Sequence, residues 1–435
     1  MSAELPGGWV RLHPLSPLAK GGRAVAFAFV VGGPPQLTHG TPPLPVLLMD
    51  LVIVALVVLG GVVSWLVTRW RVADGELQLE TGLLRRESIR VPLVRVQAVD
   101  VVRPLVGRVL GISELRLVMA GSGNSKARLS FLPEQRAIEV RAELLAIGAG
   151  LAASTPEAPE RPIASVPNGR LLASNLLNVQ TIVIALFLTL TAVGGLLSSE
   201  RMLPLLAAAI GGVFPLLHAL VGRINAEFSF SISESPDGLR LHSGLLQTRH
   251  ETIRPGRIQG VRLVEPLLWR AFGWCRLEVD VAQQRSQEAG AQSPGQLTRA
   301  LLPVGRRDQV DELLQLVLPG AVLTAPAGSA VPTRAKRKAP LSYRWLATWH
   351  DDRFFAARTG RIQVKTVVVP FAKVQSIRLT QGPVQRRLDL VTLHVDTAGR
   401  HWSAAARDRD ATEGHALLSS LPGHARAART LASLG

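Results

Sequence analysis

The chain has 435 residues, of which 47% are hydrophobic, enough for about two to four domains. Its single cysteine, Cys275, excludes an intramolecular disulfide framework and a metal site built from several cysteines. The 49 Lys and Arg against 32 Asp and Glu give a net charge of +17, which suits an anionic membrane surface; with 5% aromatic residues we expect no nucleic acid as partner.

The first 69 residues are expected to form a leader and a transmembrane hairpin. Within them, residues 24–37 contain an apolar part too short to span a bilayer alone. A short or broken helix, an interfacial segment and a signal-peptide core are the alternatives for this stretch. Residues 51–67 contain no Lys, Arg, Asp or Glu and are long enough for a transmembrane helix.

A second transmembrane hairpin is expected over residues 179–222, after a linker over residues 149–178. Its two apolar segments, 179–197 and 202–222, also contain no Lys, Arg, Asp or Glu. The alternative is a set of buried helices in a soluble protein. Arginines and lysines gather outside the short connections within each hairpin, so the positive-inside rule places the soluble parts and both termini in the cytoplasm. We therefore expect a multi-pass protein of the cytoplasmic membrane.

The remaining stretches, 70–148, 224–318 and 341–421, repeat one another. A glycine lies fifteen residues before a glutamine in each, and a proline follows the glutamine after seven, seven and eight residues. These nine residues, called the repeat signature below, are Gly82, Gln97, Pro104, Gly244, Gln259, Pro266, Gly360, Gln375 and Pro383. Because the spacing recurs three times, we expect three copies of one domain, with a basic Pro/Ala linker at 319–340 and a tail at 422–435.

Each copy predicts several short antiparallel strands followed by one C-terminal helix. Alternating segments flank the signature glycine as in a β-hairpin, and the unit ends in a helix-like segment. Plain strand alternation would place Val96, Ile258 and Val374 on one face. The glutamines would share the other face with Val99, Val261 and Ile377. The expected fold class is an α+β membrane protein with three such domains and two transmembrane hairpins.

The segments TGLLRR, PLVRVQAVDVVRPLVGRVLGISELRL, VPNGRLLASNLL and VVVPFAKVQSIRLTQGPVQRRLDLVTLHVD resemble bacterial pleckstrin-homology (PH)-like membrane proteins, the YdbT-like group. The resemblance covers nearly the whole chain. It implies PH-like domains, each a curved antiparallel sheet with a C-terminal helix, that alternate with transmembrane hairpins. It also implies a smaller membrane protein with one such domain as a partner, and it supplies no catalytic residues.

A direct search for catalytic chemistry finds no motif. The sequence has no phosphate-binding glycine loop, no HExxH and no GxSxG, and its ten histidines are scattered. His350 and His401 lie near aspartates and are expected to be solvated polar residues. His218 is the one ionisable group in the expected spans, so a pump is not expected. We expect no enzyme activity, no cofactor and no metal.

Basic residues near the apolar segments and in the linker are candidates for contact with anionic lipid, at about 1 kcal/mol per charge near the surface. They are Arg69, Arg71, Arg223, Arg334, Lys336, Arg337 and Lys338. The alternative of equal weight is a solvated linker whose charges only enforce topology and solubility.

The leading functional hypothesis is a non-enzymatic membrane protein whose three cytosolic PH-like domains act as a scaffold or a lipid- or protein-binding platform, with a role in envelope stress resistance. Its expected partner is a smaller PH-like membrane protein or a second copy of the chain. The alternative is a component of a small-molecule or peptide exporter. The PH fold alone does not decide between them, because one fold hosts many functions.

Overall fold

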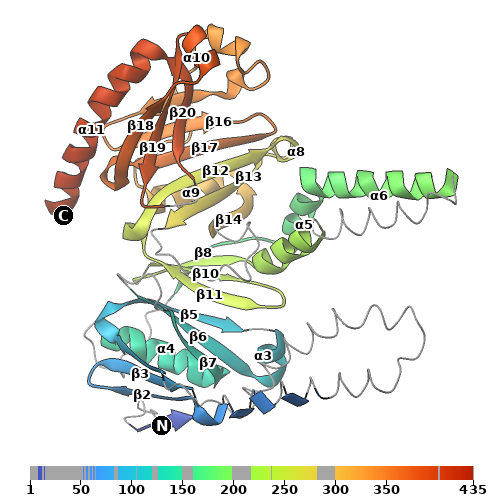
Figure 1. Cartoon of the computed structure of the whole chain (residues 1–435), viewed down its shortest axis with the longest axis vertical. Coiled ribbons are helices and arrows are strands. Elements are labelled where there is room, and N and C mark those ends of the chain that lie inside the picture. The colour runs from blue at the N-terminus through green and yellow to red at the C-terminus, as the bar shows by residue number, and fades with distance from the viewer. Residues whose placement is uncertain are drawn as a thin grey trace. The chain divides into compact units, whose positions relative to one another are not determined.

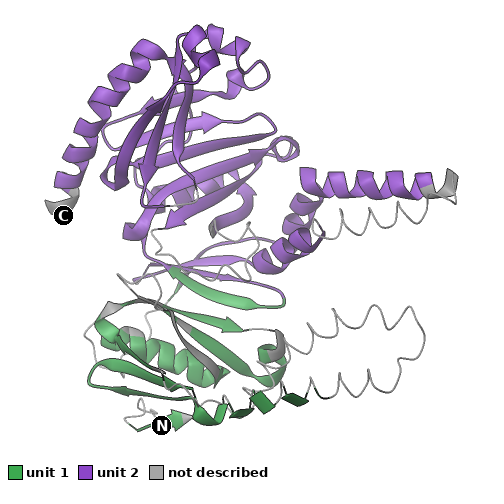
Figure 2. Ribbon diagram, viewed as in Figure 1, with its two compact units in different colours: residues 1–160, 246–252, 284–287 green, residues 161–245, 253–283, 288–435 purple. Residues whose placement is uncertain are grey.

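The computed structural model describes residues 8–11, 14, parts of 52–67, 68–82, 87–103, 105–119, 126–148, 160–197, 217–236, 238–281, 299–399 and 402–434. The chain divides into two compact units (Figure 2). Unit 1 contains residues 1–160, 246–252 and 284–287, and unit 2 contains residues 161–245, 253–283 and 288–435.

The three predicted repeats share one order of elements, with three strands, a 3-10 turn, three further strands and a closing helix (Figure 1). A short helix follows the fourth strand of each repeat. The first repeat contains β2 (Arg69–Ala73), β3 (Glu76–Thr81), β4 (Glu87–Pro92), η1 (Leu93–Arg95), β5 (Val96–Arg103), α3 (Leu105–Leu110), β6 (Ile112–Met119), β7 (Lys126–Pro133) and α4 (Glu134–Gly148).

The second repeat contains β9 (Ser231–Ser235), β10 (Gly238–Ser243), β11 (Thr248–Ile253), η3 (Pro255–Arg257), β12 (Ile258–Pro266), α8 (Leu267–Arg270), β13 (Trp274–Val281), β14 (Arg299–Arg306) and α9 (Arg307–Val317). The third contains β15 (Ala347–His350), β16 (Phe354–Thr359), β17 (Gln363–Pro370), η7 (Phe371–Lys373), β18 (Val374–Thr380), α10 (Pro383–Arg387), β19 (Leu390–Thr397), β20 (Ala404–Asp410) and α11 (Ala411–Leu434).

Unit 1 is built around the core of the first repeat. A short strand, β1 (Val10–Arg11), extends the sheet to the order β1-β2-β3-β4, and β5 lies between β6 and β11. Helix α4 places Ala137, Val140 and Leu144 on one face at spacings of three and four residues, and all three are fully buried. They pack with Trp70 and Leu77 in one cluster, so the helix closes the core of this repeat.

Unit 2 contains a six-stranded antiparallel sheet in the order β14-β13-β12-β17-β16-β15, and a three-stranded sheet in the order β18-β19-β20. The six-stranded sheet takes half of its strands from the second repeat and half from the third. Helix α9 buries Val310, Leu313, Leu314 and Val317, a spacing that gives one apolar stripe. This stripe packs on the core of the second repeat.

Two stretches that we expected to be linkers contain packed elements. Within residues 149–178 lie β8 (Arg161–Ser165) and α5 (Asn168–Leu176), and Trp269 Nε1 donates to the carbonyl oxygen of Ser174 on α5 at 2.9 Å. Within residues 319–340 lies the 3-10 helix η5 (Thr333–Arg337), whose Ala335 is fully buried. The elements β8, α5 and η5 therefore contribute to the folded body of unit 2.

The prediction of two transmembrane hairpins is wrong. Across the described residues, no single helix is both long and apolar enough to cross a bilayer. Helix α6 (Val179–Leu197) coincides with one expected span, but by itself it does not pass the test of length and hydropathy for a membrane span. It meets that test only together with α5, at a bend of 57°. Residues 24–37 and 202–216, and part of 51–67, lie outside the described residues.

Candidate interaction surfaces

The signature glycines occupy the same backbone conformation in all three repeats. Gly82, Gly244 and Gly360 have positive φ angles of 97°, 119° and 93°, which side chains on a Cβ disfavour. Each glycine follows the second strand of its repeat and leads toward the third. A Cβ on Gly360 would overlap the carbonyl oxygen of Gln363. The glycine is therefore required by the turn of each hairpin.

The signature glutamines mark a β-bulge in all three repeats. The pairing of β5 with β6 shifts register between Val96 and Ala98, on either side of Gln97. The pairing of β12 with β13 shifts in the same way around Gln259, and that of β18 with β19 around Gln375. A bulge inserts one residue opposite a regular strand and increases its twist. The glutamine is thus the extra residue of the strand.

This bulge corrects the expected facing of the side chains. Plain alternation separated Val96 from Val99, yet both lie in the core cluster of the first repeat. Ile258 and Val261 likewise share the core of the second repeat. The extra residue resets the alternation, so core residues stand three apart across the glutamine.

The glutamine side chains meet different surroundings. Gln259 is buried, and its Nε2 donates to the carbonyl oxygen of Arg257 in the preceding 3-10 turn at 3.2 Å. Gln375 at the same repeat position is exposed. The prolines lie at the start of short helices: Pro266 precedes α8 and Pro383 is the first residue of α10, while Pro104 lies outside the described residues.

Two joints connect successive repeats by strand pairing. In the first joint, within unit 1, Arg103 of β5 lies opposite Thr248 of β11. In the second joint, within unit 2, Glu265 of β12 lies opposite Val364 of β17. In both cases the residue six after the signature glutamine lies opposite the residue four after the signature glycine of the next repeat. The two joints therefore use one register.

Close packing supports the second joint. A Cβ on Gly260 would come 2.9 Å from the carbonyl oxygen of Val368 and 3.3 Å from the ring of Trp402, closer than side chains normally approach. The guanidinium of Arg262 lies over the Trp402 ring at 5.3 Å from its centroid. Gly260 thus permits a close approach of backbone and ring in the joined sheet.

A buried group of charges consists of residues on β12 and β13 of the same sheet and of Glu227, which precedes β9. Arg276 contacts Glu227 at 2.6 Å and Glu278 at 2.7 Å, and Arg262 contacts Glu278 at 2.5 Å. Burial alone would raise the pKa of Glu278, but the guanidinium groups of Arg276 and Arg262 and their hydrogen bonds hold it below its ordinary value of 4.5. The carboxylate therefore stays ionised inside the protein.

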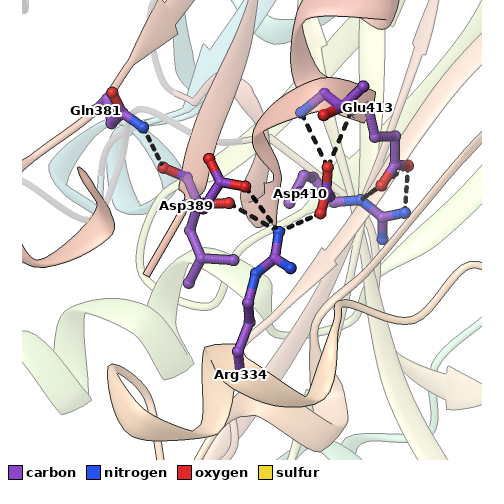
Figure 3. A network of polar contacts seen from close by, with 8 residues as sticks. Arg334, Gln381, Asp389, Asp410 and Glu413 are labelled. Carbon is purple, nitrogen blue, oxygen red and sulfur yellow. Dashed lines mark hydrogen bonds and ion pairs between the residues drawn. The ribbon is translucent and has the colours of Figure 1, made fainter. Parts of the chain in front are cut away.

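Two of the four basic linker residues form ion pairs with aspartates of the third repeat. Figure 3 shows Arg334 facing the carboxylates of Asp389 and Asp410, with which it forms ion pairs. Lys338 pairs with the buried carboxylate of Asp408 at 2.5 Å. These ion pairs connect η5 and the residue after it to the third repeat. The side chains of Lys336 and Arg337 are exposed instead.

The other candidates for lipid contact lie elsewhere in the chain. The guanidinium groups of Arg69 and Arg71 stack on the ring of Trp9, at 4.8 Å and 4.6 Å from its centroid. Arg223 lies 3.7 Å from the carboxylate of Glu227. Of the seven candidates, five therefore have contacts within the protein, and Lys336 and Arg337 are the two that present their charge outward.

Helix α6 presents an apolar, exposed surface. Its side chains include no Lys, Arg, Asp or Glu. Exposed leucines and β-branched residues lie around it, with Leu186 at 58% and Leu190 at 60% exposure. Contiguous exposed apolar surface of this kind marks an interaction site for lipid or protein.

No group of three or more His, Cys, Asp or Glu side chains is arranged to hold a metal ion within the part of the chain that the structure describes. The charged clusters instead consist of arginine and carboxylate pairs that fix strands and turns. The described residues offer uncovered strand edges, the apolar helix α6, and the exposed basic residues Lys336 and Arg337 for contact with other molecules. These are features of a binding surface.

Comparison with protein families gives three matches along the chain. The bacterial PH domain model matches three times, over residues 26–147, 182–321 and 313–421. The chain belongs to the bacterial PH domain family. No curated protein and no solved structure matches this PH-like chain significantly. The three repeats are thus three bacterial PH domains, as predicted, while the YdbT-like grouping stays a prediction.

Sequence reasoning missed the residues that form the second joint. Gly260 and Ser376 directly follow the signature glutamine, and only the first is a glycine. Trp402 lies in the third repeat, far from Gly260 in sequence. A glycine within a strand was the one available signal, because it marks a bulge or a close backbone approach.

Proposed function

We propose that this protein is a non-enzymatic interaction platform, in which three PH-like domains are held at a membrane by the apolar surface of α6 and bind protein partners. The observation that carries the proposal is the exposure of α6. Burying its large side chains in a lipid phase is favourable by about 25 cal/mol per Å² of apolar surface. A helix can bury apolar side chains at the membrane interface without crossing the bilayer.

The outward charges of Lys336 and Arg337 support a preference for anionic lipid. Each charge near an anionic surface contributes about 1 kcal/mol, and the effect decays within a Debye length. Arg334 and Lys338 lie in the same segment but pair with aspartates, so they serve as matched comparisons.

The test of membrane contact is a polarity-sensitive fluorophore placed on α6. The only native thiol, Cys275, is buried, and burial, followed by the nearby charge of Glu265, raises its pKa to about 12, so it does not react at neutral pH. We expect the dye at Leu186→Cys to shift to the blue and to be quenched by brominated lipid. The control is the dye at Glu312→Cys on α9, an exposed position. Equal, weak quenching at both positions would contradict membrane contact by α6.

The lipid preference has its own measurement. Native mass spectrometry of the full chain in detergent counts bound phosphatidylglycerol. We expect Lys336→Gln combined with Arg337→Gln to lower the bound number in a salt-dependent manner. If the double variant retains the number seen in the unmodified chain, these charges do not contact lipid.

A further inference from the structure

The strand that contains the signature glutamine pairs with a strand of the next repeat in the first two repeats but not in the third. The glutamine strand of the first repeat, β5, is covered by β11, and that of the second, β12, is covered by β17. The glutamine strand of the third, β18, is an edge of its sheet, paired only with β19 among the described strands. At the other end of the series, β4 is the strand equivalent to β11 and β17, and it is also a sheet edge. The strands β18 and β4 are thus equivalent to the two partners of an internal joint, but none of the described strands covers their outer edges.

The exposed face of β18 agrees with an unfilled joint. Four successive residues of β12, Ile258 to Val261, are buried, as are Leu263 and Val264, and Arg262 between them is partly covered. In β18 only Val374 is buried, and Gln375, Ser376, Arg378 and Thr380 are exposed. An uncovered strand edge presents backbone N–H and C=O groups to any complementary strand.

We infer that β18 of one copy of this chain pairs with β4 of a second copy, in the register of the internal joints. Transferring that register places Thr380 opposite Glu87, Leu379 opposite Ser88 and Arg378 opposite Ile89. Such β-augmentation draws its affinity from main-chain hydrogen bonds. The inference goes beyond the proposed function, because it does not depend on membrane contact by α6.

The residue types at these positions favour a second copy as the occupant. In the second joint Arg262 lies opposite Val367, and Leu263 lies opposite Thr366. The same positions in the new joint hold an arginine opposite an isoleucine and a leucine opposite a serine, so two neighbouring pairs keep their chemistry. Ile89 packs on the core of the first repeat as Val367 does on that of the third.

Because the two edges are different surfaces, the contact is head to tail. A heterologous contact of this kind continues from copy to copy, and it closes into a ring or extends as a filament according to its rotation. The assembly would continue the alternation of repeats that the chain already contains. Each added copy buries one more β18 and one more β4.

Disulfide trapping between two differently tagged copies tests the register. One copy carries Glu87→Cys and the other Thr380→Cys, and directly opposite strand residues lie within disulfide reach. The off-register control combines Arg90→Cys with Thr380→Cys, which shifts one cysteine by three residues, about 10 Å along the strand. We expect the in-register mixture to give about tenfold more mixed disulfide dimer than the control.

Three outcomes of the trapping experiment would overturn the inference. Equal trapping in both mixtures would exclude the register, and no trapping would exclude the contact. Trapping of Thr380→Cys to a different protein would assign the edge to another partner. The unmodified chain gives an independent readout that requires no variant: mass photometry in detergent should show multiples of one chain that grow with concentration. A single-chain mass at every concentration would also contradict it, whereas the dye experiment on α6 would be unaffected.

Discussion

The strands β12 and β18 carry the same motif in opposite surroundings. RIQGV in the second repeat lies inside a six-stranded sheet, covered by β17 on one side and β13 on the other. KVQSI in the third repeat begins a strand whose outer side pairs with none of the described strands. Both strands have the bulge at the glutamine. The difference shows that the motif builds the strand, while burial of the strand depends on a following repeat.

The largest expected effect contrasts the buried charges beside β12 with the exposed pair beside β18. The substitution Arg276→Met removes the guanidinium that neutralises the carboxylates of Glu278 and Glu227 in the interior. Removing one partner of a buried ion pair costs about 3–5 kcal/mol of stability. We expect a large fall in the urea midpoint followed by tryptophan fluorescence. The matched control, Arg378→Met, removes an exposed guanidinium that pairs with Asp396 at 2.7 Å, and it should leave the midpoint nearly unchanged. Equal effects would contradict the difference in burial.

The next effect concerns the residue directly after the glutamine. Gly260→Val places a side chain against the carbonyl oxygen of Val368 and the ring of Trp402, so we expect a loss of about 1–3 kcal/mol from overpacking. Ser376→Val occupies the same repeat position on the exposed strand and should change stability by less than about 0.5 kcal/mol. Thermal unfolding of the two variants under the same conditions gives the comparison. A tolerated Gly260→Val would show that the second joint is not closely packed.

A third comparison tests whether the signature glycine is needed for the strand joint or for the hairpin of each repeat. Gly360→Ala precedes the covered strand β17, and Gly82→Ala precedes the edge strand β4. Because both positions have positive φ, alanine should cost about 1–2 kcal/mol at each. Thermal midpoints should fall by similar amounts. A loss confined to Gly360→Ala would assign the glycine to the joint instead of the hairpin.

The smallest effect is the part of the contribution of Glu278 that changes with pH. The folded-state pKa of Glu278 is depressed, so its ionised form stabilises the protein above the ordinary value of 4.5, and that contribution is lost as the pH falls through the lower folded value. We expect the stability difference between the unmodified chain and Glu278→Gln to be present at pH 7 and to shrink below pH 4.5. Urea titrations across this range measure it. A difference that grows on acidification would contradict the sign.

Much of the repeat could be predicted from sequence because its signals are local. Gly82, Gly244 and Gly360 at hairpin turns, and the alternating segments around them, depend on residues close together in the chain. The C-terminal helix follows from apolar spacing such as that of Val310, Leu313 and Leu314. The number of repeats could be predicted for the same reason.

The exchange of strand partners between repeats could not be predicted in this way. Pairing of Glu265 with Val364 joins residues about a hundred positions apart, and no local pattern states which edge meets which. The bulge at Gln259 reverses the alternation that a regular strand would follow. Hydropathy alone also predicted a span at α6, whereas this helix passes the test for a membrane span only together with α5, at a bend of 57°.

Hydrogen exchange of the full chain, measured separately on its single-chain and assembled fractions, compares the joint and the edge most directly. We expect the β12 peptide to be protected in both fractions, since β13 and β17 occupy both of its edges. The peptides of β18 and β4 should gain protection only in the assembled fraction. These results would show that one strand joint is formed within the chain at β12 and is repeated between copies at β18 and β4. That claim would be contradicted if β18 and β4 exchanged identically in the two fractions, or if β12 exchanged rapidly in either.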